Sequence, residues 1–191
     1  MAAVVATMMA VVPMGANMLV PFLSKRLGKR NLYSLSALVQ FLGIFVIMLA
    51  DRNTVGILIG AFISAAGYGA KESIYFSMQA DPVDYGEWKS GVQTAGILSS
   101  VNGFLGKVAQ AVAGGLSGVL LAMGNYENSS VVQSSEALLS IKAMYLYLPM
   151  ILLVCSIIIM HFYTLDKELP QIQKELNERK SGNIKREEPV K

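Results

Sequence analysis

The sequence predicts an all-α protein that crosses the membrane five times. Of its 191 residues, 53% are hydrophobic and 15% are charged, whereas soluble domains carry about 25% charged residues. The charges are also clustered, since none lies in residues 1–23 or 31–50. Apolar runs of about 18 residues or more are typical of helices that span a bilayer, where every backbone polar group must be satisfied internally.

Five apolar segments are long enough to cross, and charged stretches separate them. A basic loop follows the first segment, Asp51 and Arg52 follow the second, and an acidic turn, residues 80–91, follows the third. The third and fourth segments exceed the ~20 residues of one crossing, which predicts tilted or extended helices. The predicted spans are residues 2–23, 32–50, 54–80, 93–123 and 141–163.

Small residues recur at a spacing of four in two of these spans. Such spacing lets helix backbones approach closely, so it predicts helix packing. The residues are Gly56, Gly60 and Ser64 in the third span, and Gly114 and Gly118 in the fourth.

The Lys and Arg residues predict the orientation. Twelve of them lie in the basic loop 24–31, the acidic turn and the segment after Tyr163, whereas Arg52 and Lys142 lie on the opposite side. Because basic loops stay in the cytoplasm, we expect these three segments there, in a plasma-membrane protein. Residues 164–191 mix seven basic with six acidic residues, which predicts a solvated cytoplasmic tail and not a lipid-binding patch.

The chain opens inside its first predicted span, with no basic residue ahead of it. A signal peptide would begin with a basic segment and carry a shorter apolar core. The orientation above also places Met1 outside the cell. We therefore expect the chain to be one part of a larger protein whose N-terminal portion is missing.

One cation lies in the middle of the fourth span. Lys107 has apolar or small residues for a full turn on both sides, and a cation near the bilayer centre costs at least about 2.5 kcal/mol. It shares a helical face with small and polar residues, which is typical of a water-filled or ligand-filled cavity. The alternative is close helix packing, with the lysine reaching to the interface. This face comprises Ser100, Gly103, Lys107, Gln110 and Gly114.

The third span carries two adjacent charges, Lys71 and Glu72. Neighbours in a helix point about 100° apart, so each needs its own partner. We expect Glu72 to face the same cavity and to pair with Lys107. Alternatively, both charges lie close enough to the cytoplasmic end to be hydrated.

The acidic turn predicts a short helix, with Asp81 at the N-cap and Pro82 at the first helical position. The helix dipole favours the carboxylates that follow. Because the basic loop offers matching cations, we expect an ionic latch at the cytoplasmic mouth that breaks on opening. The alternative is two hydrated loops that never meet. The predicted gate residues are Asp81, Asp84, Glu87, Lys25, Arg26, Lys29 and Arg30.

Sequence motifs of catalysis are absent. The sequence has no Gly-rich phosphate loop, no His/Cys metal spacing and a single histidine. We expect no enzyme activity, no cofactor, no protein-bound metal centre and no nucleic-acid partner.

The stretch ADPVDYGEWKSGVQTAGILSSVNGFLGKVAQAVAGG, residues 80–115, resembles the C-terminal half of the glycoside–pentoside–hexuronide:cation symporters of the major facilitator superfamily. The family pattern is an Ala-Asp-x-x-Asp-Tyr-Gly-Glu turn followed by a span that carries a lysine. Here the turn is residues 80–87 and the lysine is Lys107. The basic loop also resembles a cytoplasmic loop motif of the superfamily.

The resemblance implies twelve helices in two six-helix bundles, with a sugar bound between them at mid-membrane. This chain would supply the last five helices, and the missing part would be the N-terminal six-helix bundle plus one helix. The coupling cation, Na⁺ or H⁺, would bind in that missing part. The resemblance implies that Lys107, Asn102 and Gly103 line the sugar site. Gln110, from the helical face of the fourth span, and Glu72, from its expected pairing with Lys107, complete the predicted substrate-binding residues.

We therefore predict secondary transport of a sugar or glycoside with a cation, by alternating access, as part of a larger protein in the lipid bilayer. Two alternatives stay open. One is a symporter of a lipid-like solute on the same scaffold. The other is a truncated membrane protein that transports nothing.

Overall fold

A computed structural model describes residues 2–51, 53–127 and 133–181, so Arg52 and residues 182–191 of the predicted tail lie outside the described residues. The described residues form helices and contain no strand. Five helical stretches among them are long and apolar enough to cross a membrane, which confirms the predicted fold class. They are Ala3–Leu27, Lys29–Ala50, Thr54–Ser90, Ala95–Met123 and Ser135–His161.

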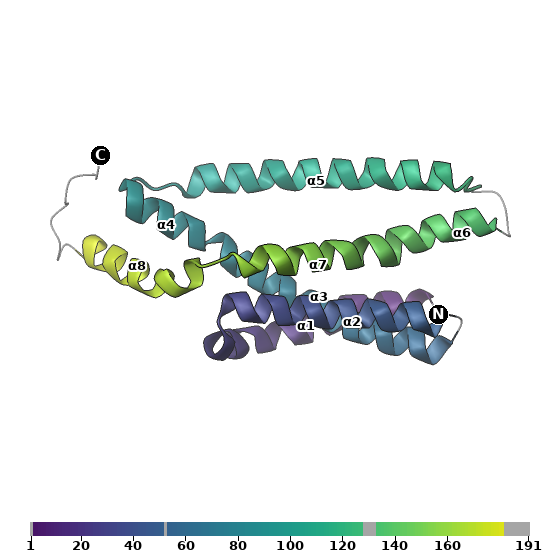
Figure 1. Cartoon of the computed structure of the whole chain (residues 1–191). Coiled ribbons are helices and arrows are strands. Elements are labelled where there is room, and N and C mark those ends of the chain that lie inside the picture. Colours follow the sequence, from purple (N-terminus) through teal and green to yellow (C-terminus); the bar gives the residue numbers. More distant parts are fainter. Residues whose placement is uncertain (1, 52, 128–132, 182–191) are drawn as a thin grey trace.

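The first three helices form one closely packed group (Figure 1). They are α1 (Ala2–Leu27), α2 (Lys29–Ala50) and α3 (Thr54–Gln79). Gly28 alone separates α1 from α2, and its φ of 75° lies in the left-handed region that glycine adopts without strain. The Asn53 side chain caps α3, because it accepts hydrogen bonds from two backbone amides of the first turn.

Small residues bring α2 and α3 together. A Cβ atom placed on Gly60 would lie 2.8 Å from the carbonyl oxygen of Gly43, so a larger side chain there would push the helices apart. Ser64 is buried one turn further along α3. The predicted packing role of this spacing is therefore confirmed in α3. At Gly114 and Gly118 of the fourth span, by contrast, no described atom outside the glycine's own stretch of helix lies within 4 Å of such a Cβ.

The acidic turn forms its own helix, α4 (Asp81–Ser90), which follows α3 after the single residue Ala80. The next helix, α5 (Ala95–Met123), lies on the side of the molecule opposite α1 (Figure 1). No residue of α5 is buried within the described part of the chain. Its polar face, with Lys107, is therefore exposed.

The last span consists of three consecutive helical pieces, α6 (Ser135–Lys142), the π-helical turn η1 (Ala143–Tyr147) and α7 (Leu148–His161). It returns antiparallel to α5 (Figure 1). Leu153 of α7 packs against Ala37 and Ile44 of α2, which fixes this span on the first group of helices.

The predicted tail folds back as a helix, α8 (Leu165–Lys180), which packs against α4. Leu169, Ile172 and Leu176 repeat at helical spacing along α8 and are buried. A wholly solvated tail is therefore wrong for this helix, because its apolar face is covered. We call the end of the molecule formed by the α1–α2 turn, α4 and α8 the α4 end (Figure 1).

Candidate functional site

A buried carboxylate lies where α3 passes into α4. Asp81 is 1% exposed, its Oδ1 lies 2.5 Å from the Lys29 Nζ, and its Oδ2 accepts a 2.8 Å hydrogen bond from the Tyr163 hydroxyl. A buried charge must be paired and hydrogen-bonded, and these two partners meet that need. The side chains of Val20, Leu32, Ile74 and Met78 form the apolar cluster beside it, with Tyr163 packed against them.

The position of Asp81 in the helix corrects the sequence prediction. Ala80, and not Asp81, is the N-cap of α4, and Asp81 is the first helical residue. Its carboxylate makes no capping hydrogen bond, because it is turned to Lys29 and Tyr163. Pro82 is accordingly the second helical residue and not the first, although it still stands in the first turn of α4.

The other two acidic gate residues contact the C-terminal helix. Asp84 Oδ2 accepts a 2.8 Å hydrogen bond from Gln173 Nε2, and Glu87 Oε1 lies 3.0 Å from Lys180 Nζ. Both partners belong to α8, so these carboxylates do not face the basic loop. The ionic latch expected from the sequence is thereby reduced to the Lys29–Asp81 pair among the described residues.

The remaining residues of the basic loop have different surroundings. The Arg30 Nη2 lies 3.1 Å from His161 Nδ1, and the Arg30 backbone amide donates to the Asp166 carboxylate. Lys25 and Arg26 are exposed in the last turn of α1, and neither forms an ion pair with another described residue. These two cations therefore remain accessible at the α4 end.

The single tryptophan joins α4 to α8. The Trp88 Nε1 donates a 2.6 Å hydrogen bond to Glu175 Oε2, and the Trp88 carbonyl accepts a 3.0 Å hydrogen bond from Arg179. The hydrogen bond from Trp88 lowers the pKa of Glu175, and the hydrogen bond from Gln171 and the charge of Arg179 act in the same direction. Each of these contacts favours the ionised carboxylate.

The predicted substrate-binding residues lie on two separate helices. Four of them, Asn102, Gly103, Lys107 and Gln110, are exposed along α5. Glu72 lies on α3, is partly buried, and forms no ion pair with Lys107, although both residues are described. The expected pairing of these two charges is therefore not formed within this chain.

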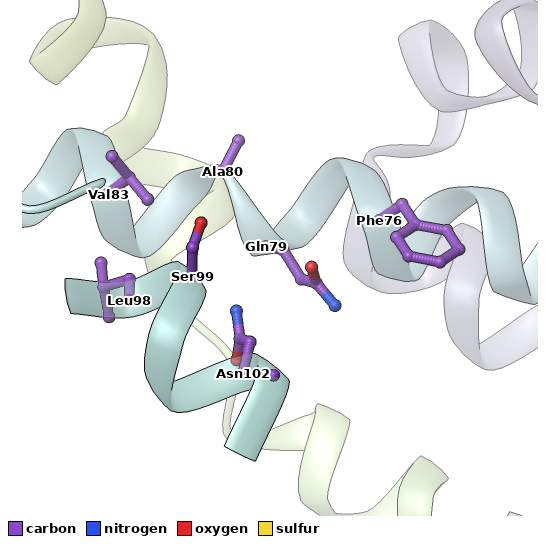
Figure 2. Close-up of a pocket in the computed structure, with 8 residues that line it drawn as sticks. Phe76, Gln79, Ala80, Val83, Leu98, Ser99 and Asn102 are labelled. Atoms are coloured by element: carbon purple, nitrogen blue, oxygen red, sulfur yellow. The ribbon is translucent and has the colours of Figure 1, made fainter. Parts of the chain in front are cut away.

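A pocket of about 470 Å³ opens at the α4 end between α3, α4 and α5. Figure 2 shows the Gln79 side chain of α3 and the Asn102 side chain of α5 pointing into the same space, with Ser99 beside them. Phe76, Val83 and Leu98 supply apolar walls. Asn102 and Gly103 are the predicted residues that line this pocket, whereas Glu72, Lys107 and Gln110 do not.

The family model described as MFS/sugar transport protein matches residues 1–167 of the chain. The chain belongs to the MFS/sugar transport family. This confirms the resemblance that residues 80–115 carry.

Three curated proteins are similar to this chain over most of its length. The isoprimeverose transporter of Lactiplantibacillus pentosus is 31% identical over 166 residues, 86% of this chain and 34% of its own length. The glucuronide carrier protein homolog of Escherichia coli (strain K12) is 28% identical over 85% of this chain and 36% of its own length. The uncharacterized symporter YjmB of Bacillus subtilis (strain 168) is 31% identical over 83% and 35%.

The chain spans about a third of the length of these transporters. It is accordingly a partial major facilitator fold, in a multi-pass membrane protein of the MFS/sugar transport family. No solved structure matches it at a significant level.

Sequence reasoning missed several residues that the structure places at the α4 end of this MFS/sugar transport chain. Gln79 lies seven residues after Glu72, which is about two helical turns along the same face. This spacing could have predicted that Gln79 faces the same side of α3 as Glu72. Ser99 stands one turn before Asn102 and was equally accessible to that argument. The hydrogen bond between Trp88 and Glu175 had no comparable signal, because it depends on how α8 folds back.

Proposed function

We propose that the chain is the C-terminal part of a secondary transporter that moves a sugar or glycoside with a cation, Na⁺ or H⁺, by alternating access. The observation that carries this proposal is the match to a sugar transport family over residues 1–167, together with relatives named for isoprimeverose and glucuronide transport. Transport of this kind changes no covalent bond, so the protein needs to bind the solute, change conformation and release the solute. It needs no catalytic residue.

In this proposal the solute binds against α5. The exposed Lys107 supplies a charge-assisted hydrogen bond to solute hydroxyl or carboxylate oxygens, which is stronger than a neutral one. Asn102 and Gln110 add amide donors and acceptors, and Gly103 lets the solute approach the backbone. Glu72, on α3, is a further acceptor on the same path. The exposure of residues 101–110 of α5 supports this role, because a buried face would leave no room for a solute.

The rest of the protein would complete the cavity. We propose that this chain supplies the last five of twelve helices, and that a six-helix bundle plus one helix precedes it. The cation ligands would lie in that preceding part. In this arrangement the α4 end and the C-terminus face the cytoplasm, as the distribution of Lys and Arg predicts.

The gate takes a more specific form than the sequence suggested. Lys25 and Arg26 are the exposed cations of the basic loop, so we propose that they close the cytoplasmic mouth against carboxylates of the other half. The other five gate residues have partners within this chain, so they would support the cytoplasmic mouth without reaching the other half. They are Lys29, Arg30, Asp81, Asp84 and Glu87.

Uptake by the complete transporter that contains this chain tests the proposal. Proteoliposomes receive radiolabelled isoprimeverose, a phenyl glucuronide or a lysolipid, with and without inward Na⁺ and H⁺ gradients. We expect gradient-driven glycoside uptake, and no lysolipid uptake. Uptake of the lysolipid alone would favour a symporter of lipid-like solutes, and no uptake of any probe would favour a membrane protein that does not transport.

The Lys107→Ala variant then tests the site. Hydrogen bonds to a charged group contribute about 1.5–3 kcal/mol, so we expect uptake at low glycoside concentration to fall by about 10-fold or more while membrane insertion is unchanged. Lys142→Ala is the matched control, because Lys142 lies in α6, at the opposite end of the molecule. Normal uptake by Lys107→Ala would remove Lys107 from the site.

A further inference from the structure

The pocket at the α4 end is displaced from the cation of α5. Lys107 follows Gly103 by four residues, which is about 6 Å along a helix axis, and it does not line the pocket. The pocket therefore lies between Lys107 and the α4 end. A solute that leaves Lys107 toward the α4 end would meet this pocket next.

The polar groups of the pocket have no partners within the described part of the chain. Neither the Gln79 and Asn102 amides nor the Ser99 hydroxyl makes a hydrogen bond to another described residue, although all three line the same space (Figure 2). Each amide offers two N–H donors and a carbonyl acceptor, and the hydroxyl offers one donor and two lone pairs. Polar groups in a pocket with apolar walls need partners, so water or a polar ligand must satisfy these.

The rest of the lining suits a solute with both hydroxyl groups and C–H faces. Phe76 offers an aromatic ring that is 61% exposed, and Val83 and Leu98 add aliphatic surface. A sugar ring has this dual character, with hydroxyl groups at its edge and C–H groups on its faces. The volume of about 470 Å³ falls within the ~300–1,000 Å³ of small-ligand pockets. No charged side chain lines the pocket, so a neutral, hydroxyl-rich group fits better than an ion.

We propose that this pocket is a second subsite for a glycosyl ring, on the α4 side of Lys107, with Gln79 and Ser99 as residues that contact the solute there. The proposal rests on the glycoside transport proposed above. Asn102 stands at the boundary of the two subsites, because it lines the pocket and precedes Lys107 on α5. In this arrangement the solute reaches Lys107 directly from one side of the membrane. It passes through the pocket when it moves between Lys107 and the other side.

The side of the membrane on which affinity changes tests this arrangement. The complete transporter is reconstituted in a single orientation, and the half-saturation concentration of isoprimeverose is measured from each side. We expect Gln79→Leu to raise this concentration about two- to tenfold from the side of the α4 end and to leave it unchanged from the other, because a lost neutral hydrogen bond has that effect. Gln133→Leu, in the loop before α6, is the matched control.

Equal half-saturation concentrations for wild type and Gln79→Leu on both sides would overturn the subsite, provided that the wild type transports. An equal rise on both sides would also overturn it, since Gln79 would then belong to a single central site. Absence of wild-type uptake would remove the subsite together with the proposed function. The milder Ser99→Ala change supplies a second variant, with the same one-sided expectation, if Gln79→Leu does not insert.

Thiol labelling gives a readout that does not depend on transport rates. In a Gln79→Cys variant made in the Cys155→Ser background, with any cysteines of the preceding part also replaced by serine, a membrane-impermeant maleimide is applied from the side of the α4 end. We expect isoprimeverose to slow the labelling at least twofold, and KCl at the same osmolality to leave the rate unchanged. Labelling at the same rate with and without isoprimeverose, in a transporter that carries it, would show that the pocket holds water only.

Discussion

Replacing Lys29 by Met should destabilise the protein, because it leaves the Asp81 carboxylate buried with one hydrogen-bond donor. Asp81 is 1% exposed, and the Lys29 Nζ lies 2.5 Å from its Oδ1. Removing one partner of a buried ion pair costs about 3–5 kcal/mol. The Lys29 side chain is 23% exposed, so water partly screens the pair, and we expect about 2–3 kcal/mol.

A double-mutant cycle isolates the pair. Asp81→Asn keeps the shape of the side chain and removes the buried charge, so Lys29→Met should cost less in the Asp81→Asn background than in wild type. We expect a coupling free energy of about 1–2 kcal/mol. Lys174→Met is the matched control, since Lys174 is exposed on α8 and forms no ion pair with another described residue, so its loss should change stability by less than about 0.5 kcal/mol.

The assay is thermal unfolding of the complete protein in detergent. After heating to each temperature, gel filtration measures the fraction that stays monodisperse, and this fraction gives the midpoint temperature. A loss of 1 kcal/mol lowers the midpoint by about 2–4 °C in a unit of 150–250 residues and by less in a longer protein. We expect Lys29→Met to lower the midpoint by several degrees and Lys174→Met to leave it in place. Equal shifts for the two variants, or strict additivity of Lys29→Met and Asp81→Asn, would refute the buried pair.

Two further outcomes follow from the packing of the helices. Glu175 has a lowered pKa in the folded protein, so its contribution to the docking of α8 is present above its ordinary value of 4.5 and is lost as the pH falls through the lowered value. Hydrogen exchange of the α8 amides across pH 3–6 should show this loss, and Trp88→Phe should move its onset to higher pH. Gly60→Leu should cost about 1–3 kcal/mol in thermal unfolding, because its side chain would meet the backbone of Gly43; a wild-type midpoint would contradict the close approach.

The number of membrane-length helices could be predicted from the sequence, because a segment inside the lipid bilayer must be apolar along its whole length. Residues 1–23 and 31–50 carry no charge over a length that a membrane-spanning helix requires. Helices α1 and α2 of the structure follow these two segments. The spacing of Gly60 and Ser64 likewise predicted a close helix contact, since small residues at that interval act locally along one face. Both features depend on residues that lie close together in the chain.

Contacts between distant segments were harder to predict. The sequence indicated that acidic and basic segments lie at one end, but it did not say which residues would meet. Asp84 and Glu87 turned to α8 because its apolar face, carried by Leu169 and Ile172, packs against α4 and brings Gln173 and Lys180 within reach. A sequence rule that pairs oppositely charged segments on the same side of the membrane cannot anticipate a helix that folds back between them.

The position of the buried pair bears on how the protein opens. In the alternating access proposed above, one half of the transporter moves largely against the other, and Lys29, Asp81 and Tyr163 would all lie in the half that contains this chain. A contact within one half need not break in that movement, and breaking it would add about 2–3 kcal/mol to the opening barrier. The Lys29–Asp81 pair, with Tyr163, is therefore better suited to hold α2, α4 and the segment after α7 together throughout that cycle than to act as a latch. By the same reasoning, substitutions at Asp81 should act through stability, whereas substitutions along the exposed face of α5 should act through transport in a protein that still folds.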